Sequence, residues 1–316
     1  MLLLSRKLLI SFCLVLPLPG FTQSGKLNVS ADSSMAIKSI RYKSEFVTNL
    51  PTAITETSGL IVLNGMLWTI NDSGNPAEIY QVDSSSGAVI RKVVINNAVN
   101  TDWEAITQDD SNIYIGDFGN NSGNRTDLRI LKIPKNCLSN HSDSIVQAGY
   151  IHFRYPDQFL FKSALNKNNF DCEAFFYRND SLHLFSKDWS DLQTRHYILP
   201  ADTGTYTAKL VEKFNADGLI TDASINKKGN IILLGYKNTG GNAYSCFCWL
   251  ISGYEDCLFF GGKKSRVELG SALQLGQSEG IVLNEDNSAW LSSESIHFSL
   301  IHHPAKLFRL YLSNYY

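Results

Sequence analysis

The chain lacks the excess of positive charge that would recruit a nucleic acid or an anionic membrane. Its 28 Lys and Arg residues nearly balance its 30 Asp and Glu residues, so the formal net charge is −2 over 316 residues. Proteins that hold phosphate backbones or anionic surfaces by their overall field are much more basic. Charged residues make up only 18% and hydrophobic residues 44% of the chain, which is typical of a folded globular protein.

Long apolar runs and helical periodicity are also lacking. Beyond the N-terminal region no run is long and apolar enough to span a bilayer. No segment keeps apolar residues at helical spacing over several turns between good caps. Short β-branched runs such as Ile130–Ile133 are instead typical of strands. The sequence therefore predicts an all-β protein without a membrane span.

The N-terminus has the pattern of a secretory signal peptide. Two basic residues precede an apolar stretch, residues 8–21, and small polar residues follow it. We expect cleavage near Gln23 and export to the periplasm or the medium. Cys13 follows Ile-Ser-Phe, which is a poor lipobox, so a lipoprotein anchor is not expected. Residues 24–316 are then predicted to form one domain, acting as a monomer.

Cysteines are few, and their number is odd once the signal peptide is removed. Cys137, Cys172, Cys246, Cys248 and Cys257 remain. An exported protein can form disulfides, and the turn at residues 252–255 favours a pair between Cys248 and Cys257, with Cys246 as a near rival. At least one thiol is left over. Buried thiols without any bridge are the alternative.

Five short stretches repeat one pattern, in which a polar or acidic residue precedes Gly or Ala at the start of an apolar run. Repetition on this scale indicates an array architecture, and because the units read as short strands, the array is predicted to be a β-propeller. The repeats are centred on Gly59, Ala105, Ala174, Ala223 and Gly280.

The number of blades and the closure of the ring follow from these repeats. The gap between Ala105 and Ala174 is long enough to hide a sixth blade, but it contains only one further loop, Pro156–Phe170, so five blades are favoured over six. The last repeat lacks a fourth strand, and Ile37–Val47 has no repeat of its own. We expect this N-terminal segment to supply the outer strand of the last blade, which would also cover an exposed strand edge.

Acidic residues are predicted to converge at one end of the propeller axis. In a blade the first strand lines the channel and the second runs antiparallel beside it, so the start of one and the end of the other share a face. The first-strand starts supply Glu104, Glu173, Asp222 and Glu279, preceded by Glu56, Asp102 and Asp171. The second-strand ends supply Asp72, Asp117, Asp188 and Glu294, accompanied by Asn71, Asn120, Asn121 and Lys187.

A ring of carboxylates cannot stay ionised without compensation. Two like charges ~4 Å apart repel by about 4 kcal/mol at an effective dielectric near 20. Protonation, pairing with Lys187 or Arg125, or a bound cation would relieve this. Oxygen ligands suit Ca²⁺ best and Mg²⁺ less well, and the absence of His at these positions argues against zinc. The alternative is structural, with the acids accepting hydrogen bonds from backbone amides of neighbouring blades. The candidate cation ligands are Glu104, Glu173, Asp222, Glu279, Asp72 and Asp117, with Asn71, Asn121, Arg125 and Lys187 as further contacts.

The segments Ser58–Leu60, Leu67–Gly74, Asp102–Ile106, Ile113–Asn121 and Gly276–Ile281 resemble those of secreted bacterial propellers of largely unassigned function. These are similar to the SdiA-regulated and phytase-like esterase propellers. A looser similarity extends to the gluconolactonase and paraoxonase propellers. There an acid that opens a first strand is an axial metal ligand, and this resemblance implies that role for Glu104, Glu173 and Glu279. This chain differs in having five repeats and no His near the ring.

Two functions are compatible with these observations. The first is a non-catalytic binding or scaffold module at the cell envelope, with a divalent cation in its acidic axial site and an unknown envelope or extracellular ligand. The second is a metal-dependent hydrolase of an ester, lactone or phosphoester. In that case the cation would polarise the scissile oxygen and activate a water, with Asp102, Asp171 or Glu279 as general base.

Overall fold

The computed structural model describes residues 39–138, 143–241, 243–298 and 301–316. The predicted signal peptide, residues 1–23, lies outside the described residues. Among the described residues, the helical elements are short and none could cross a membrane. They are η1 (Lys135–Leu138), η2 (Phe259–Gly261) and α1 (Ala272–Leu275).

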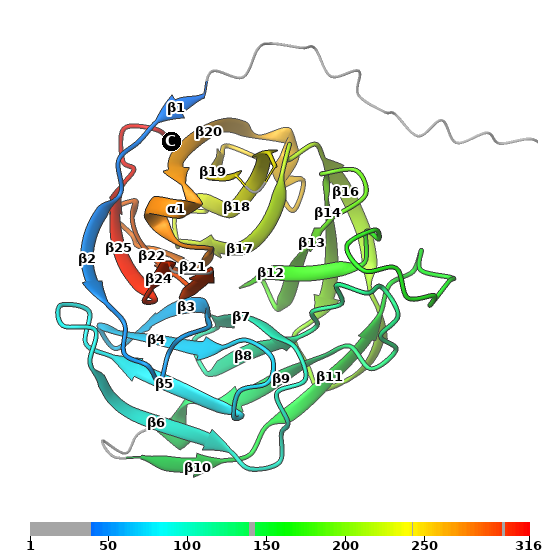
Figure 1. The fold of residues 1–316 in the computed structure, drawn as a ribbon. Coiled ribbons are helices and arrows are strands. Elements are labelled where there is room, and N and C mark those ends of the chain that lie inside the picture. The colour runs from blue at the N-terminus through cyan, green and yellow to red at the C-terminus, as the bar shows by residue number, and fades with distance from the viewer. Residues whose placement is uncertain (1–38, 139–142, 242, 299–300) are drawn as a thin grey trace, which may run out of the picture. The chain divides into compact units, whose positions relative to one another are not determined.

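Five sheets, each built on four antiparallel strands, form the blades of a propeller (Figure 1). The prediction of an all-β, five-bladed propeller is confirmed, and the described chain has no sixth blade. The innermost strands are β3 (Thr57–Leu63), β7 (Trp103–Gln108), β12 (Asp171–Arg178), β17 (Leu219–Ile225) and β21 (Ser278–Leu283). The second strands are β4 (Met66–Asn71), β8 (Asn112–Asp117), β13 (Ser181–Lys187), β18 (Ile231–Gly240) and β22 (Ser288–Ser293).

The outer strands complete each blade in the same order. The third strands are β5 (Glu78–Val82), β9 (Arg129–Pro134), β14 (Thr194–Pro200), β19 (Ala243–Ser252) and β25 (Lys306–Tyr311). The fourth strands are β6 (Val89–Ile95), β11 (Gly149–Arg154), β16 (Lys209–Phe214), β20 (Lys263–Ser271) and β2 (Glu45–Asn49). A separate hairpin, β23 (Ile296–Phe298) and β24 (Ile301–His303), follows the second strand of the last blade.

Local sequence explains the hairpins that join the first two strands of a blade. Asn64 and Gly65 connect β3 to β4, and both have positive φ angles, 52° and 76°. A two-residue turn of this kind matches the twist of the strands that it joins. The hairpin therefore fixes the register in which Ile61 pairs with Trp68.

The hydrophobic core is divided among the spaces between the blades. Each of five buried clusters combines side chains from two adjacent blades, as Trp68 of blade one and Ile106 of blade two show. The innermost strands of adjacent blades also contact one another around the whole ring, from β3 through β7, β12, β17 and β21 back to β3. Burial of apolar surface between blades therefore holds the start of each inner strand near the axis.

The ring closes through the N-terminal segment, as predicted. Strand β2 pairs antiparallel with β25 and is the fourth strand of the last blade. The segment before it also forms β1 (Ile40–Arg41), which pairs parallel with β20 in the preceding blade. Two other short strands also pair parallel with the preceding blade. Strand β10 (Ser144–Val146) covers the outer edge of blade one by pairing with β6, and β15 (Gly204–Thr207) covers that of blade two by pairing with β11. A covered edge cannot pair with another chain.

The predicted disulfide between Cys248 and Cys257 is wrong, since both cysteines are free, and so is Cys246. Cys248 lies in the middle of β19 and packs into the cluster between blades four and five. Cys257 lies in the connection after β19 and packs against the cluster between blades three and four. The two thiols therefore lie on opposite faces of one blade. The predicted hairpin was too short, because ten residues separate β19 from β20.

Candidate functional site

A β-bulge recurs at one position near the start of all five inner strands. In each case the pairing with the second strand skips one residue of the inner strand. Bulges often occur beside active sites, because the extra residue changes the direction of a side chain. The skipped residues are Gly59, Glu104, Glu173, Thr221 and Glu279.

The glutamates at these bulges share one cavity at this end of the axis. The cavity has a volume of about 260 Å³, and five carboxylates but only one ammonium group line it. Of the residues that the sequence analysis expected at one site, this cavity is lined by Asp72, Glu104, Glu173, Glu279, Lys187 and Asn121. The other lining residues are Ser58, Trp189, Tyr236, Gln277 and Glu294.

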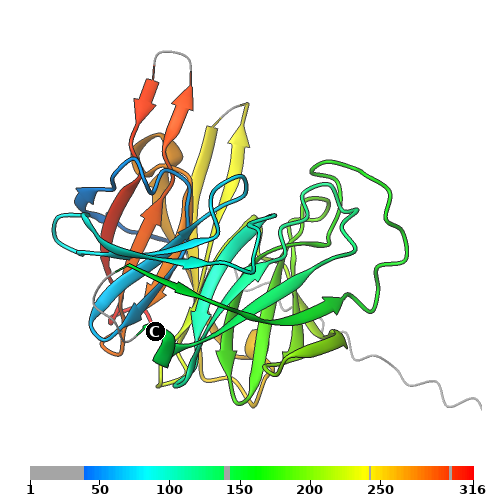
Figure 2. The same cartoon turned by 90° about the horizontal axis from the view of Figure 1, so that it is seen from below.

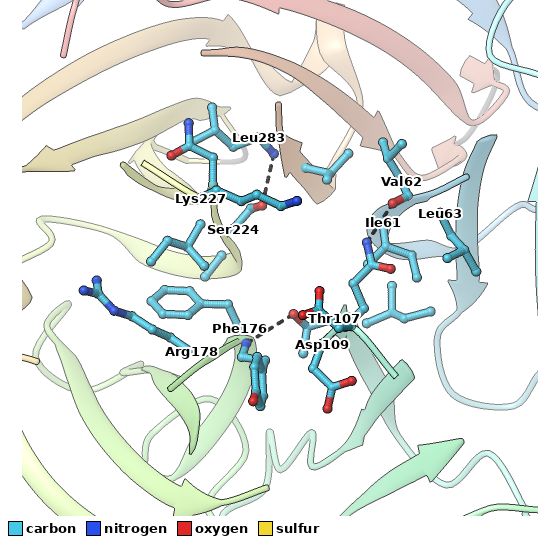
Figure 3. Close-up of a pocket in the computed structure, with 18 of the residues that line it drawn as sticks. Ile61, Val62, Leu63, Thr107, Asp109, Phe176, Arg178, Ser224, Lys227 and Leu283 are labelled. Carbon is cyan, nitrogen blue, oxygen red and sulfur yellow. Dashed lines mark hydrogen bonds between the residues drawn. The ribbon is translucent and has the colours of Figure 1, made fainter. Parts of the chain in front are cut away.

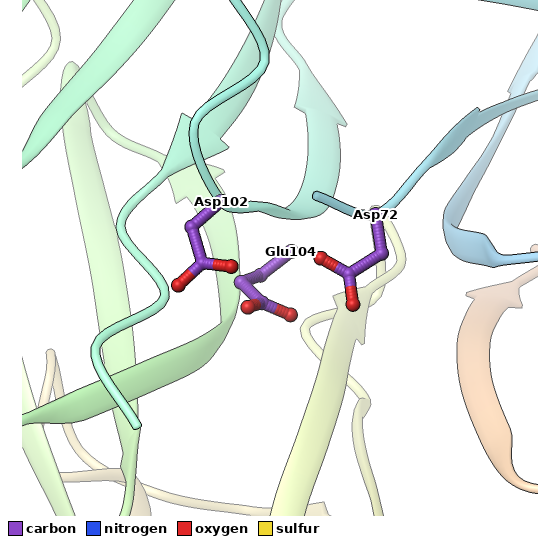
Figure 4. A group of neighbouring side chains, drawn as sticks. All are labelled: Asp72, Asp102 and Glu104. Carbon is purple, nitrogen blue, oxygen red and sulfur yellow. The ribbon is translucent and has the colours of Figure 1, made fainter. Parts of the chain in front are cut away.

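Three carboxylates on the side of blades one and two form the densest group (Figure 4). Oxygens of Asp72, Asp102 and Glu104 all lie within 4.8 Å of one another. Gly119 packs against the same group, because a β-carbon there would stand 2.0 Å from Glu104 Oε1 and 2.5 Å from Asp102 Oδ2. Any larger residue at position 119 would therefore displace these carboxylates.

On the opposite side of the cavity, Lys187 compensates the negative charge of Glu173. Its Nζ lies 2.5 Å from each carboxylate oxygen of Glu173, and both side chains are only 4% exposed. The ammonium also lies 5.0 Å from the Trp189 ring centroid and 5.2 Å from that of Tyr236, within the range of cation–π attraction. Burial opposes the charged form of Lys187, but the attraction of the surrounding carboxylates outweighs it and raises its pKa.

The carboxylates on the side of blades one and two have no such partner. Among the described residues, no salt bridge involves Asp72, Asp102 or Glu104. Burial, followed by repulsion from Asp72 and Asp171, raises the pKa of Asp102 to about 7. Burial and repulsion from Asp72 also raise the pKa of Glu104 well above its ordinary value. Lys187 thus supplies a counter-charge on one side of the cavity, whereas the carboxylates on the other side have no basic partner and can ionise only at the cost of mutual repulsion.

Two of the remaining carboxylates show the same effect. Burial raises the pKa of Glu279 to about 7, although Lys187 and a 2.6 Å hydrogen bond from Gln277 Nε2 oppose the shift. Burial and repulsion from Glu279 raise the pKa of Glu294 well above its ordinary value. The cavity therefore favours protons or a cation at several of its carboxylates.

Asp222, which the sequence placed in the ring, lies elsewhere. In blade four the bulge falls on Thr221, so Asp222 is one residue out of register with the glutamates and its side chain takes a different direction. Its carboxylate accepts hydrogen bonds from the amides of Ala223, at 2.8 Å, and Ile281, at 2.6 Å. This is the structural role considered as the alternative, in which an acid ties two blades together.

Asp117 and Arg125 are also not cavity residues. Asp117 is fully buried and is paired with Arg125 at 3.0 Å and with Arg129 at 2.8 Å. Arg125 donates in addition to the Gly119 carbonyl, at 2.9 Å. The pair therefore orders the loop that carries Gly119 and does not offer an open ligand position.

Asp171 and Asn71 support the site from outside the cavity. Asp171 accepts hydrogen bonds from Trp189 Nε1 at 2.8 Å and from the Asn120 amide at 2.6 Å, so both of its oxygens are engaged. Asn71 Nδ2 donates to the Ala53 carbonyl at 2.9 Å. Asp171, predicted as a candidate general base, is instead placed to orient the Trp189 ring.

Sequence reasoning left five cavity residues out of the ligand set, and the first of them, Ser58, stands where the other repeats have an acid. Glu294 was recognised as an acid at a second-strand end but was not proposed as a ligand. Tyr236 pairs with Leu219 at the position where Lys187 pairs with Asp171, so repeat alignment could have found it. Trp189 and Gln277 lie outside the strands, and no repeat pattern marks them.

A second, larger cavity of about 990 Å³ lies at the other end of the axis, where the hairpins between the first two strands meet (Figure 3). Arg178 and Lys227 belong to its lining, as does Asp109. The charges there balance, with four acidic and four basic residues among those that line it. The smaller cavity, with its unbalanced carboxylates, is therefore the candidate functional site.

No family model matches the chain, and no curated protein matches it. The solved structures that it resembles include a putative oxidoreductase (glucose dehydrogenase) from Thermus thermophilus, at 8% identity and a TM-score of 0.44 over 85% of this chain and 99% of the other. Another is a GH43 β-1,3-galactosidase with bound galactodeoxynojirimycin, at 10% identity and a TM-score of 0.45 over 85% and 94%. Both likenesses are too distant to indicate a ligand or an activity for this chain.

The raised pKa values predict a pH dependence of stability in EDTA. Asp102 and Glu279 have pKa values of about 7 in the folded protein and about 4 in an unfolded chain. Between these values the folded state binds more protons, so their stabilising contribution is present near pH 4 and is lost as the pH rises through 7. We expect the free energy of unfolding to fall by on the order of 2–4 kcal/mol between about pH 5.5 and pH 8.

Urea unfolding at the two pH values measures this difference. Calcium should reduce it, because a bound cation replaces the protons as the counter-charge of the carboxylates. A free energy of unfolding that rises over this range in EDTA would contradict the assignment of raised pKa values to Asp102 and Glu279.

Proposed function

We propose that the acidic axial cavity binds a divalent cation and that the protein is a cation-dependent binding module. The observation that carries this proposal is the uneven compensation of charge. Glu173 has a buried ammonium partner at 2.5 Å, whereas Asp72, Asp102 and Glu104 crowd together without one. A cation bound by these three carboxylates would supply the missing charge on the side that Lys187 does not reach.

Calcium fits the group better than magnesium. All the potential ligand atoms are oxygens, which hard cations prefer. Ca²⁺ accepts about six to eight oxygen ligands in a flexible arrangement, so three carboxylates whose oxygens lie within 4.8 Å of one another can supply part of its shell. Magnesium would require the stricter octahedral geometry.

Titration calorimetry and thermal unfolding of the metal-free protein test this proposal. Calcium at 100 times its dissociation constant should raise the free energy of unfolding by about 2.7 kcal/mol. Magnesium at the same concentration should have a smaller effect. Equal unfolding curves in EDTA and in calcium, together with no heat of binding, would exclude the cation site.

The cellular setting of this module rests on sequence alone. The signal peptide pattern in residues 1–23 supports export to the periplasm or the medium. The resemblance to secreted SdiA-regulated and phytase-like esterase propellers supports the same setting. We therefore propose that the cation positions an envelope or extracellular ligand in the cavity. That ligand would reach the remaining volume beside Trp189, Tyr236 and Gln277.

A metal-dependent hydrolase is the second candidate, and one observation favours it. Glu279, which is not one of the three proposed ligands, has a pKa of about 7, the value at which a general base is most effective at neutral pH. A cation held by Asp72, Asp102 and Glu104 would polarise the scissile oxygen of an ester, lactone or phosphoester. Chromogenic esters, lactones and phosphates assayed with calcium and with EDTA test this candidate. Uniform inactivity of the calcium-loaded protein would remove it.

A further inference from the structure

The loop between β11 and β12 exposes three consecutive large apolar side chains. Phe159 is 82% exposed, Leu160 81% and Phe161 44%, and Leu165 in the same loop is 65% exposed. These four account for a third of the twelve large hydrophobic side chains that are exposed among the described residues. A run of three exposed apolar residues is unfavourable in a soluble protein unless it has a function.

Both ends of this exposed segment are attached to the loop that borders the cation site. Gln158 is buried, and its Nε2 donates to the Gly123 carbonyl at 2.9 Å. On the other side the Ala164 amide donates to the Ser122 carbonyl at 2.8 Å. The tip, which we define as residues 159–163, is thus held outward between two attachment points, and it forms part of the green arch at the right of Figure 2.

The charges of the tip and its flank are of one sign. Between Gln158 and Phe170 the only charged residues are Lys162 and Lys167, and both are exposed. Asp157, just before this stretch, accepts a hydrogen bond from the Tyr197 hydroxyl at 3.1 Å. The local charge is therefore positive although the whole chain has a net charge of −2. Apolar side chains beside lysines are the combination that binds at anionic lipid surfaces.

The size of the apolar tip favours a lipid surface over a folded protein partner. Aromatic side chains bury about 150–250 Å² each, so the four exposed side chains together offer on the order of 500 Å². A specific protein–protein interface requires roughly 800 Å² from each partner. A bilayer needs no matching shape and accepts a small group of side chains.

The backbone of the tip limits how deep it can enter a bilayer. Among the described residues, no backbone hydrogen bond outside the strands involves residues 159–163. Unpaired amides are costly in the hydrocarbon core but are satisfied by water at the level of the lipid headgroups. The geometry therefore suits interfacial insertion of the side chains, with the backbone remaining hydrated.

We propose that Phe159, Leu160 and Phe161 insert into the headgroup region of an anionic lipid bilayer and that Lys162 and Lys167 contact its headgroups. The contact is peripheral and holds the acid-lined end of the propeller close to the lipid surface. It does not depend on a cation in the axial cavity.

Co-sedimentation with lipid vesicles tests this proposal. The protein used comprises residues 24–316, which include the whole described propeller and exclude the apolar N-terminal stretch. The vesicles are made of phosphatidylcholine alone or of equal parts phosphatidylcholine and phosphatidylglycerol, in EDTA so that calcium cannot bridge protein and lipid. We expect binding to the anionic vesicles, reduced at least tenfold in F159S/L160S. K162Q/K167Q should lose most of the preference for anionic over neutral vesicles.

Controls separate this contact from nonspecific adhesion and from other partners. Ile145→Ser removes a side chain that is 70% exposed on β10, which pairs with β6 at the outer edge of blade one, and should bind like the wild type. Thermal unfolding should be the same in all variants, because the substituted side chains are exposed. Equal vesicle binding by F159S/L160S and the wild type, or no wild-type binding, would overturn the proposal. So would self-association in sedimentation velocity that only the tip variant abolishes, which would identify a second copy as the partner.

Discussion

Replacing Glu104 with Gln is expected to weaken calcium binding by about 100-fold or more. Glu104 belongs to the group of three carboxylates and has no salt-bridge partner among the described residues. Its neutral isostere keeps the shape of the cavity but removes one of the charges that set the affinity of a calcium site. Changes to groups around a metal ligand already cost 10–100-fold, so loss of a direct ligand should cost at least as much. Titration calorimetry measures the effect.

Glu56→Gln is the matched control for this substitution. Glu56 lies just before β3, is exposed, and accepts a hydrogen bond from Asn75, so that it reaches the group only through the small repulsion that adds to burial in raising the pKa of Asp72. Its removal should change calcium affinity by less than about threefold, since exposed charges are screened. In EDTA, Glu104→Gln should stabilise the protein, because it removes a buried charge that repels Asp72 and Asp102. A Glu104→Gln protein that binds calcium as the wild type does would show that Glu104 is not a ligand.

Replacing Lys187 with Met is expected to lower the free energy of unfolding by about 3–5 kcal/mol. This is the usual cost of leaving one partner of a buried ion pair without its counter-charge. Methionine keeps most of the apolar contact with Trp189 and Tyr236 but leaves Glu173, only 3% exposed, without a counter-ion. Urea unfolding in EDTA measures the loss.

Two further variants show whether the loss of stability comes from the unpaired charge of Glu173. The double variant K187M/E173Q removes both charges and should recover most of the stability, since replacing a whole buried pair is often nearly neutral. Lys92→Met breaks the pair between Lys92 and Glu78, in which the lysine is 45% exposed, and should cost far less, because an exposed ion pair contributes little to stability. A loss for Lys187→Met no larger than that for Lys92→Met would mean that the cavity is hydrated enough to screen Glu173.

The sequence was sufficient to predict the blades, the closure and several of the residues that line the axial cavity. Its repeats carried enough information to align Glu104, Glu173 and Glu279, and the antiparallel order of strands within a blade brought Asp72 and Lys187 to the same end. These residues line one cavity. Periodicity and blade topology are properties of the chain that do not depend on side-chain packing.

The features that the sequence did not predict depend on register and on partners distant along the chain. The position of the bulge decides whether Glu104 or a neighbour faces the axis, and in blade four it separates Asp222 from the ring by one residue. The ion pair between Asp117 and Arg129 can be recognised only from the tertiary structure. The prediction of a disulfide between Cys248 and Cys257 was wrong for the same reason. A turn in the sequence does not show that the two side chains lie on opposite faces of one blade.

The most direct test of the axial site is a crystal structure of the protein soaked with calcium, with anomalous data collected to locate the ion. The account predicts a peak with oxygens of Asp72, Asp102 and Glu104 at about 2.3–2.6 Å, the usual calcium–oxygen distance. It also predicts that Lys187 remains paired with Glu173. A calcium-soaked crystal with no peak among these three carboxylates, or with calcium bound only elsewhere, would contradict it.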